Sequence, residues 1–277
     1  MNNLYRFFGD FLALHKIVGF ASAVTFTVQY SLQRWVLPRK KEYRITLGGV
    51  HFYFPSIKDF GDFTGIFFNE YYYFPRSDRP IFAIDCGSNV GISLVYIKLR
   101  CPNARVVCFE PNPAARVFLE RTIAANNWHK DVTVQPYALG RAKGTANFFV
   151  DRDMDTSSGG SLTHFFEGYK QPTVVLPVQV EKLSDFIKAP VDFLKIDIEG
   201  AEFEVLEDLI LNNKLKQVAS IQLEHHYHQG FLERPLSDML KLLESAGFKT
   251  AVQATLRPSV LIGRTKMTAY MVYAWRA

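Results

Sequence analysis

The stretch Ile81-Phe82-Ala83-Ile84-Asp85-Cys86-Gly87-Ser88-Asn89-Val90-Gly91 decides the fold of this chain. It opens with an apolar run that ends in a carboxylate, and a glycine-containing turn leads from there into a helical stretch. This order predicts a buried strand, a tight turn and a helix. The glycines let the backbone approach a ligand, and the helix start offers free N–H groups. We therefore expect a nucleotide-like ligand at the end of this strand.

Apolar runs and helical stretches alternate through the rest of the chain. After the strand Ile81–Asp85, further strands are predicted over Arg105–Phe109, Val132–Gln135, Asp192–Asp197, Val218–Leu223, Thr250–Leu256 and Thr268–Trp275. Helices are predicted over Ile92–Arg100, Asn112–Asn126, Glu202–Leu211 and Leu236–Ala246. The alternation favours an α/β fold, with a Rossmann-like, doubly wound and mostly parallel sheet of seven strands.

Two further segments surround this series. A β-hairpin insertion, formed by Thr145–Val150 and Val174–Val180, carries the polar stretch Thr156–Ser161. An N-terminal extension over residues 1–75 is predicted to hold helices in 1–37, a hairpin around Gly48-Gly49 and a helix over Asp59–Tyr71. Residues 76–277 would then form the ligand-binding domain.

Composition narrows the class of protein. The 277 residues carry a net charge of +5 without a long Lys/Arg tract, which argues against nucleic acid as a partner. Three cysteines in predicted core elements favour a reducing, cytoplasmic compartment. The run Ile17–Val36 is too polar for a confident spanning helix, and packing on its own domain is the favoured interpretation. Peripheral membrane association through residues 1–41 is the alternative.

The glycine turn differs from that of a dinucleotide-binding protein. A G-x-G-x-x-G turn rests pyrophosphate on the helix start, but Asn89 replaces the middle glycine and the third is missing. Asp85 would repel pyrophosphate and suits the ammonium of S-adenosylmethionine instead. Glu110, nineteen residues after Gly91, ends the next strand, where a carboxylate can accept both ribose hydroxyls.

Several motifs resemble the FkbM-type family of methyltransferases. They are Phe67–Tyr71, Ile84–Gly91, Phe109–Pro113, Pro136–Gly140 and Asp192–Glu202, of which the run Lys195-Ile196-Asp197-Ile198-Glu199-Gly200-Ala201-Glu202 is the most specific. The similarity covers roughly residues 43–250, and residues 1–42 lie outside it. Cys86 stands where small or β-branched residues are more usual.

The resemblance implies S-adenosylmethionine as cofactor and, usually, O-methylation. We accordingly expect the acceptor to be a hydroxyl of a sugar, a glycan or a small metabolite. The residues that the resemblance and the strand ends place at the cofactor are Glu70, Tyr71, Asp85, Gly87, Ser88, Asn89, Gly91, Glu110, Pro111, Asn112, Tyr137, Ala138 and Asp197.

Methyl transfer to a hydroxyl needs alignment and a group that removes the proton. Asp197, Glu199 and His225 are the candidate catalytic residues, because they are predicted to project from the carboxyl edge of the sheet. Glu224, His226 and His228 would project from the same edge and are further possible bases. A divalent metal held by Asp197, Glu224 and His225 is a weaker hypothesis, since their spacing matches no defined metal motif. Glu202 is expected to cap the N-terminus of its helix.

The sequence is compatible with two other classes of protein. An NAD(P)-dependent oxidoreductase on a related sheet would require the glycines that the turn lacks. A non-catalytic nucleotide-binding protein would be expected to lose Asp85, Glu110 or the glycine turn, and all of them are present. The oligomeric state is not indicated.

Overall fold

The computed structural model describes residues 11–35, 42–55, 60–151, 160–163, 173–228, 232–254 and 267–276. Its centre is a seven-stranded sheet in the order β11-β12-β10-β9-β3-β4-β5. The strands are β3 (Phe82–Cys86), β4 (Arg105–Phe109), β5 (Val132–Gln135), β9 (Phe193–Ile196), β10 (Ser220–His228), β11 (Lys249–Ala254) and β12 (Met267–Trp275). Only β12 runs antiparallel to its neighbours in this sheet. The predicted fold class is confirmed.

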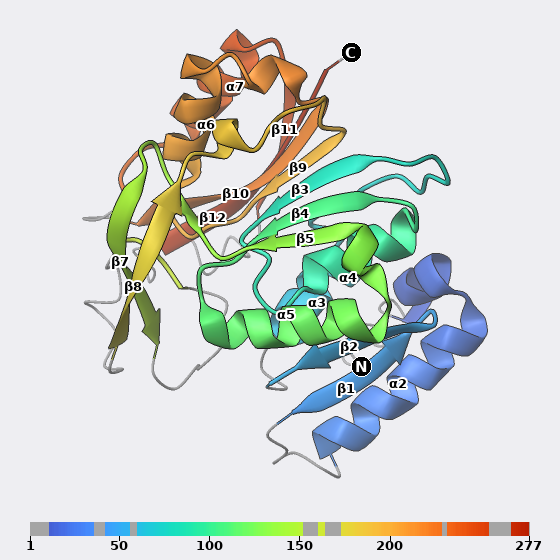
Figure 1. Ribbon diagram of the computed structural model, residues 1–277. Helices are drawn as coiled ribbons and strands as arrows, with labels where there is room; N and C mark the ends of the chain where they lie inside the picture. The colour runs from blue at the N-terminus through green and yellow to red at the C-terminus, as the bar shows by residue number, and fades with distance from the viewer. Residues whose placement is uncertain are drawn as a thin grey trace.

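Helices cover both faces of this sheet (Figure 1). One face packs against α3 (Phe60–Phe67), α4 (Ile92–Arg100) and α5 (Pro113–Ala125), and the other against α6 (Glu202–Leu211) and α7 (Leu236–Ser245). The central strand β9 is buried at every position, as expected of a parallel strand covered on both sides. Short 3₁₀ turns span Trp128–Lys130, Leu183–Asp185 and Leu215–Gln217.

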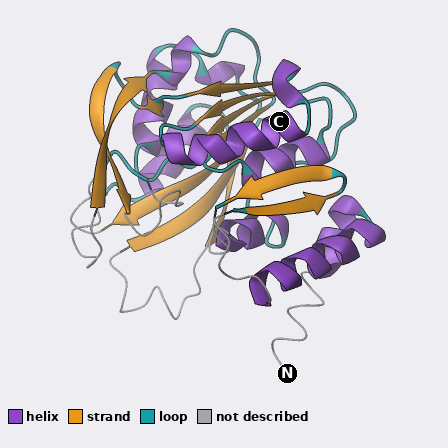
Figure 2. Cartoon of the chain, turned by 60° about the horizontal axis from the view of Figure 1, so that its bottom comes forward, coloured by secondary structure: helices purple, strands orange, loops and turns teal. Residues whose placement is uncertain are grey.

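The N-terminal segment lies against the helices on the α4 and α5 side (Figures 1 and 2). It contains helical residues 11–18, the helix α2 (Phe20–Trp35) and the predicted hairpin of β1 (Tyr43–Leu47) and β2 (Val50–Phe54). The α2 helix packs on β1, and β2 packs on α5. Within the described part of the chain, no helix is both long and apolar enough to cross a membrane. The domain boundary at residue 75 stays a prediction.

The insertion forms a small sheet of its own, in the order β6-β8-β7. Its strands are β6 (Ala138–Leu139), β7 (Gly144–Asp151) and β8 (Thr173–Glu181). Of the polar stretch predicted over Thr156–Ser161, only Gly160 and Ser161 belong to the described residues. The Ser161 hydroxyl donates to the backbone carbonyl of Glu199, at 2.5 Å. The insertion therefore touches the carboxyl edge of the large sheet.

Strand β10 is longer than the sequence predicts, and this corrects an expectation about its end. Its parallel pairing with β9 stops at Leu223, but its antiparallel pairing with β12 continues to His228. His225 and His226 therefore lie inside a strand and not in a loop after it. Because successive side chains of a strand point to opposite faces, the two histidines have different surroundings.

Candidate active site

The glycine turn after β3 is fixed by the backbone around it. Gly87 has φ 81°, and a Cβ atom there would lie 1.8 Å from the carbonyl oxygen of Asp197. The N–H groups of Gly87 and Ser88 both donate to the carbonyl of Phe109. Asn89 and Gly91 also have positive φ values, of 46° and 96°. The turn thus fits between the ends of β4 and β9 only because residue 87 has no side chain.

Asp85 lies beneath this turn and not on its surface. Its carboxylate is fully buried, accepts a hydrogen bond from the Ser93 hydroxyl at 2.6 Å and pairs with the Lys195 ammonium at 3.3 Å. Burial of a charge is costly unless it is paired. The carboxylate expected to meet the methionine ammonium is therefore engaged by the protein itself.

Lys195 joins the two strand ends. Its Nζ donates to the carbonyl of Gly87 at 2.6 Å and lies 3.5 Å from the Asp197 carboxylate. Asp197 also accepts a hydrogen bond from the Tyr72 hydroxyl, at 2.7 Å. Burial by itself raises the pKa of Asp197, but Lys195, His226 and the Tyr72 hydrogen bond outweigh it and hold the pKa below its ordinary value. About a quarter of the Asp197 side chain is exposed, so an anionic oxygen faces the site.

Glu110 stands at the end of β4, where the sequence places the ribose. Its two carboxylate oxygens accept the backbone N–H groups of Asn89 and Asn112, each at 2.8 Å. Burial raises the pKa of Glu110 to about 7, although these N–H groups favour the charged form. The Asn112 side-chain oxygen caps α5, while its buried Nδ2 has no hydrogen-bond partner among the described residues. An orphaned donor beside a carboxylate fits a ligand rich in hydroxyls.

The remaining predicted cofactor residues lie around this edge. Ser88 donates its hydroxyl to the Asp85 carbonyl, and Pro111 accepts from Arg116. Tyr137 packs near Phe186, and Ala138 is buried at the start of β6.

The predicted helix over Asp59–Tyr71 ends early, and this moves a tyrosine into the site. The α3 helix stops at Phe67, and Glu70 takes a φ of 51° as the chain turns back. Tyr71 packs its ring against Gly65, whereas Tyr72 reaches Asp197. Glu70 is exposed.

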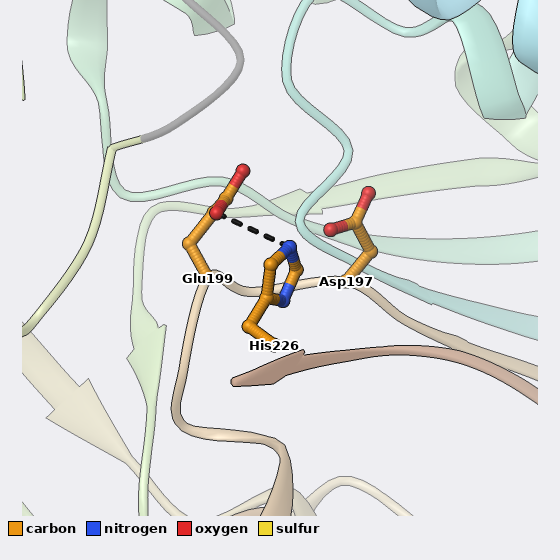
Figure 3. A group of neighbouring side chains, drawn as sticks. All are labelled: Asp197, Glu199 and His226. Atoms are coloured by element: carbon orange, nitrogen blue, oxygen red, sulfur yellow. Dashed lines mark ion pairs between the residues drawn. The ribbon is translucent and has the colours of Figure 1, made fainter. Parts of the chain in front are cut away.

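A second charged cluster adjoins the first, and we call its three members the Glu199 cluster: Glu199, His226 and Glu202. His226 Nε2 lies 3.2 Å from the Glu199 carboxylate, and its Nδ1 lies 2.9 Å from that of Glu202. Figure 3 shows the Glu199 and Asp197 carboxylates directed towards the same imidazole. One ligand atom from each of Asp197, Glu199 and His226 falls within 4.8 Å of the others. These three atoms form a compact, partly open set of donors.

Backbone geometry positions this cluster. Glu199 and Gly200 have φ values of 55° and 113°, so the chain reverses immediately after β9. Glu202 then starts α6, and its carboxylate accepts the N–H of Gly200 at 3.0 Å, as expected of a residue in the first helical turn. The same carboxylate fixes the orientation of the His226 ring.

Charge is unbalanced in the Glu199 cluster. Burial by itself lowers the pKa of His226, but Glu199, Glu202 and Glu224 outweigh it and raise the pKa well above its ordinary value. Burial is the largest cause that raises the pKa of Glu199 to about 7; His226 opposes it, and Asp197 and Glu202 add to it. A carboxyl group of this kind titrates near neutral pH.

His225 is placed differently from the sequence prediction. Its ring is 1 % exposed, packs edge-on against Phe203, and has no hydrogen-bond partner for either nitrogen within the described structure. Burial lowers its pKa. The structure therefore brings His226, not His225, to Asp197 and Glu199, because alternation along β10 turns the two side chains to opposite faces. Glu224 shares the face of His226 and contributes to its electrostatic surroundings.

The sequence assigns no role to Tyr72 and Lys195, and it offers His226 only as one of several possible bases beside His225. Lys195 lies inside the otherwise apolar run Phe193–Ile196, and a charge in a buried strand needs a partner, so this pattern could have predicted an ion pair. The period of two along β10 would have separated His226 from His225 if the strand had been extended. Tyr72 left no such signal.

Comparisons with known proteins agree with the motifs. The family described as "Methyltransferase FkbM domain" matches residues 85–250. A "Methyltransferase 1" of Beauveria bassiana is 28% identical over 212 residues, which are 70% of this chain and 81% of the relative. A "Methyltransferase sdnD" of Sordaria araneosa is 26% identical over 153 residues, 46% of this chain and 59% of the relative.

Among solved structures, M. jannaschii TYW2 in complex with AdoMet is similar, with a TM-score of 0.45 and 10% identity, over 86% of this chain and 88% of that one. This likeness is too distant to bear on function.

Proposed function

The chain belongs to the FkbM family of methyltransferases, and from this premise we propose that it moves the methyl group of S-adenosylmethionine to a hydroxyl group. Membership of the family accounts for the general reaction, which is methyl transfer dependent on S-adenosylmethionine. The proposal concerns the acceptor atom and the residues that serve it. A hydroxyl of a sugar, glycan or small metabolite is the acceptor class that we propose.

One arrangement carries the proposal: the Glu199 carboxylate, whose side chain is 19% exposed, lies 3.2 Å from His226 Nε2 and beside Asp197. Burial also raises the pKa of Glu199 to about 7. A sugar or alkyl hydroxyl must lose its proton as the methyl group arrives, and a base is most effective when its pKa lies near the working pH. We assign this role to Glu199, with His226 as the cation that holds it. An amine or thiolate acceptor would need a base of this kind less.

The cofactor's place follows from the neighbouring residues. The sulfonium of S-adenosylmethionine supplies an activated methyl group and leaves as a neutral thioether. We propose that Asp197, which stays anionic, faces its cationic end, while Glu110 and Asn112 hold the ribose and the glycine turn approaches it closely. Asp85, which is paired to Lys195, would support the turn from below and would not touch the ammonium.

We also propose that the protein acts in the cytoplasm. Free, buried cysteines at positions 86, 101 and 108 favour a reducing cytoplasm. An NAD(P)-dependent oxidoreductase would have required a glycine where Asn89 stands.

A methyl-transfer assay tests the acceptor class. The full chain is incubated with tritiated S-adenosylmethionine and a panel of methyl glucoside, catechol, a primary amine and a thiol. We expect transfer to hydroxyl compounds, and a loss of about 10²–10⁴-fold in turnover for Glu199→Gln. Glu207→Gln is the matched control, because this residue of α6 pairs at the surface with Arg141 and Arg234. Transfer to the amine or thiol alone would overturn the proposal, as would full turnover by Glu199→Gln.

A divalent cation in this site is a second candidate, favoured by one geometric feature. Glu202 holds His226 Nδ1, which leaves Nε2 directed at Glu199 and Asp197. Metal-binding imidazoles are commonly fixed in this way by a carboxylate behind them. We propose Asp197, Glu199 and His226 as the ligands, in place of the predicted Asp197, Glu224 and His225. A cation there would orient two neighbouring oxygens of the acceptor and take over the role of the imidazolium.

Neighbouring histidines make the metal proposal testable. Mn²⁺ is titrated calorimetrically into the wild type, His226→Gln and His225→Gln. Binding in the wild type and in His225→Gln, with a loss of at least tenfold in His226→Gln, is expected. The absence of Mn²⁺ binding, together with methyl transfer that is unchanged by a chelator, would remove the cation and leave Glu199 as the base.

A further inference from the structure

The helix α2 carries apolar side chains on two opposite faces. Its inner face is buried: Ala23 and Phe26 are 0% and 2% exposed, and Phe26 stacks on Phe63 with ring centroids 4.8 Å apart. Its outer face carries Phe20, Val24, Val28 and Leu32, which are 63%, 39%, 53% and 50% exposed. We call these four residues the outer row.

The outer row is a continuous feature and not a set of scattered residues. Its members are four residues apart, so they follow one another along the same side of the helix. An amphipathic helix normally turns one apolar stripe inward and leaves the other side polar. Here the inward stripe is already satisfied, so stability of the fold does not account for the outer row. A contiguous exposed apolar surface marks an interaction site.

Polar groups beside the outer row are prepared for an apolar environment. The hydroxyl of Thr25 donates to the carbonyl of Ala21 at 2.9 Å, and that of Thr27 donates to Ala23 at 2.8 Å. A hydroxyl that is bonded to its own helix loses little when it leaves water, whereas burying an unbonded hydroxyl in hydrocarbon is costly. These two hydroxyls can therefore approach lipid with their hydrogen bonds already made.

The charge of the N-terminal segment indicates which kind of surface would bind the outer row. Residues 11–41 contain Lys16, Arg34, Arg39, Lys40 and Lys41 and no Asp or Glu, so this segment accounts for the whole net charge of +5. Lys16 is exposed in the helical residues 11–18, four positions before the outer row begins. Two copies of this chain meeting through their α2 helices would bring like charges together. An anionic lipid surface attracts such a segment and receives the apolar row at the same time.

The helix is also placed for such contact. Figures 1 and 2 show α2 at the outside of the molecule, with the β1–β2 hairpin between it and α5. Gln29 anchors it there, because its side chain accepts the N–H of Thr46 at 2.9 Å. We propose that α2 lies along an anionic membrane surface, with Phe20, Val24, Val28 and Leu32 in the boundary between headgroups and acyl chains.

Vesicle sedimentation tests this proposal with the full chain. The vesicles are phosphatidylcholine alone, or phosphatidylcholine with 30 mol% phosphatidylserine as a chosen condition of about physiological charge. We expect binding to the charged vesicles that weakens as salt rises from about 0.1 to about 0.5 M. The double variant Phe20→Gln/Val28→Gln should bind at least tenfold more weakly, since it removes half of the outer row.

A matched control separates this surface from general surface apolarity. Val117→Gln/Leu211→Gln replaces two side chains that are 49% and 72% exposed on other helices. It should bind vesicles as the wild type does, and circular dichroism should show both double variants folded. Three outcomes would overturn the proposal: no binding to charged vesicles, equal loss in the control, or sedimentation velocity showing a dimer that only Phe20→Gln/Val28→Gln dissociates.

Discussion

Two charged groups of residues meet at the carboxyl edge of the sheet, and their charges are arranged in opposite ways. Asp85 and Lys195 form a fully enclosed ion pair: their charged atoms are 3.3 Å apart, and the two side chains are 0% and 3% exposed. In the Glu199 cluster, carboxylates outnumber cations, and the Glu199 side chain is 19% exposed. In the first arrangement burial by itself lowers the pKa of Lys195, but the carboxylates of Asp85 and Asp197 outweigh it and raise the pKa. In the second, burial raises the pKa of the Glu199 carboxyl group to about 7.

This difference suggests that the Asp85–Lys195 pair supports the cofactor turn, whereas the Glu199 cluster takes part in the reaction. A buried charge whose partner is fixed costs several kcal/mol to disturb and so makes a rigid platform under the cofactor turn. A carboxyl group whose pKa is about 7 exchanges protons readily at working pH. Disturbing the first group should therefore damage stability and binding, and disturbing the second should change the rate and its dependence on pH.

The largest expected effect comes from the enclosed group. Gly87→Ala would place a Cβ atom against the Asp197 carbonyl oxygen in a backbone with φ 81°. Strain and displacement together should cost about 4 kcal/mol or more and abolish binding of S-adenosylhomocysteine. Urea unfolding and calorimetry measure the two losses. Gly144→Ala, where nothing lies within 4 Å, should behave as the wild type. A Gly87→Ala protein that is as stable as the wild type and binds S-adenosylhomocysteine would contradict the supporting role of the glycine turn.

Lys195→Met should have the next largest effect. It leaves the Asp85 and Asp197 carboxylates without their shared cation. Removing one partner of a buried pair typically destabilises by about 3–5 kcal/mol. Urea unfolding measures this, with Arg79→Met as the control. That arginine is 69% exposed and pairs with Asp192 at the surface, so its loss should cost less than about 1 kcal/mol. Equal costs would show that Lys195 is not a support.

Glu110→Gln should have a smaller effect, on the way the stability of the protein depends on pH. Because burial raises the pKa of Glu110 to about 7, the folded state holds this proton more tightly than the unfolded state. Its contribution to stability is thus present at low pH and is lost as pH rises towards 7. Glutamine keeps one of the two oxygens that accept backbone N–H groups, so the substitution also loses a hydrogen bond at every pH. Without cofactor, the stability of Glu110→Gln relative to the wild type should therefore rise between pH 4 and pH 8, by up to about 2 kcal/mol.

The same variant should bind S-adenosylhomocysteine about tenfold more weakly, since one charged acceptor is lost. Exposed Glu120→Gln should show neither change. A stability difference between Glu110→Gln and the wild type that stays constant from pH 4 to pH 8 would contradict the burial argument.

The fold could be predicted from the sequence because each strand of the sheet is marked locally. Apolar runs such as Arg105–Phe109 and the turn at Gly87 specify strand and helix within a few residues. The site could be predicted only where a residue ends a strand, as for Glu110 and Asp197. His226 could not be placed, because the length of β10 depends on pairing with β12, some forty residues away. Tyr72 depends likewise on where α3 ends.

The central claim is that His226, and not His225, sets the protonation of Glu199. A pH–rate profile of methyl transfer to the best hydroxyl acceptor, recorded with a chelator present, tests it most directly. In the wild type the rate should rise with pH through a midpoint near 7, as Glu199 loses its proton, and level off above it. Removing the imidazolium in His226→Gln raises the pKa of Glu199 further, so the rising limb should move up by about one pH unit or more, with no shift in His225→Gln. An unmoved limb in His226→Gln, or an equal shift in both variants, would contradict the account.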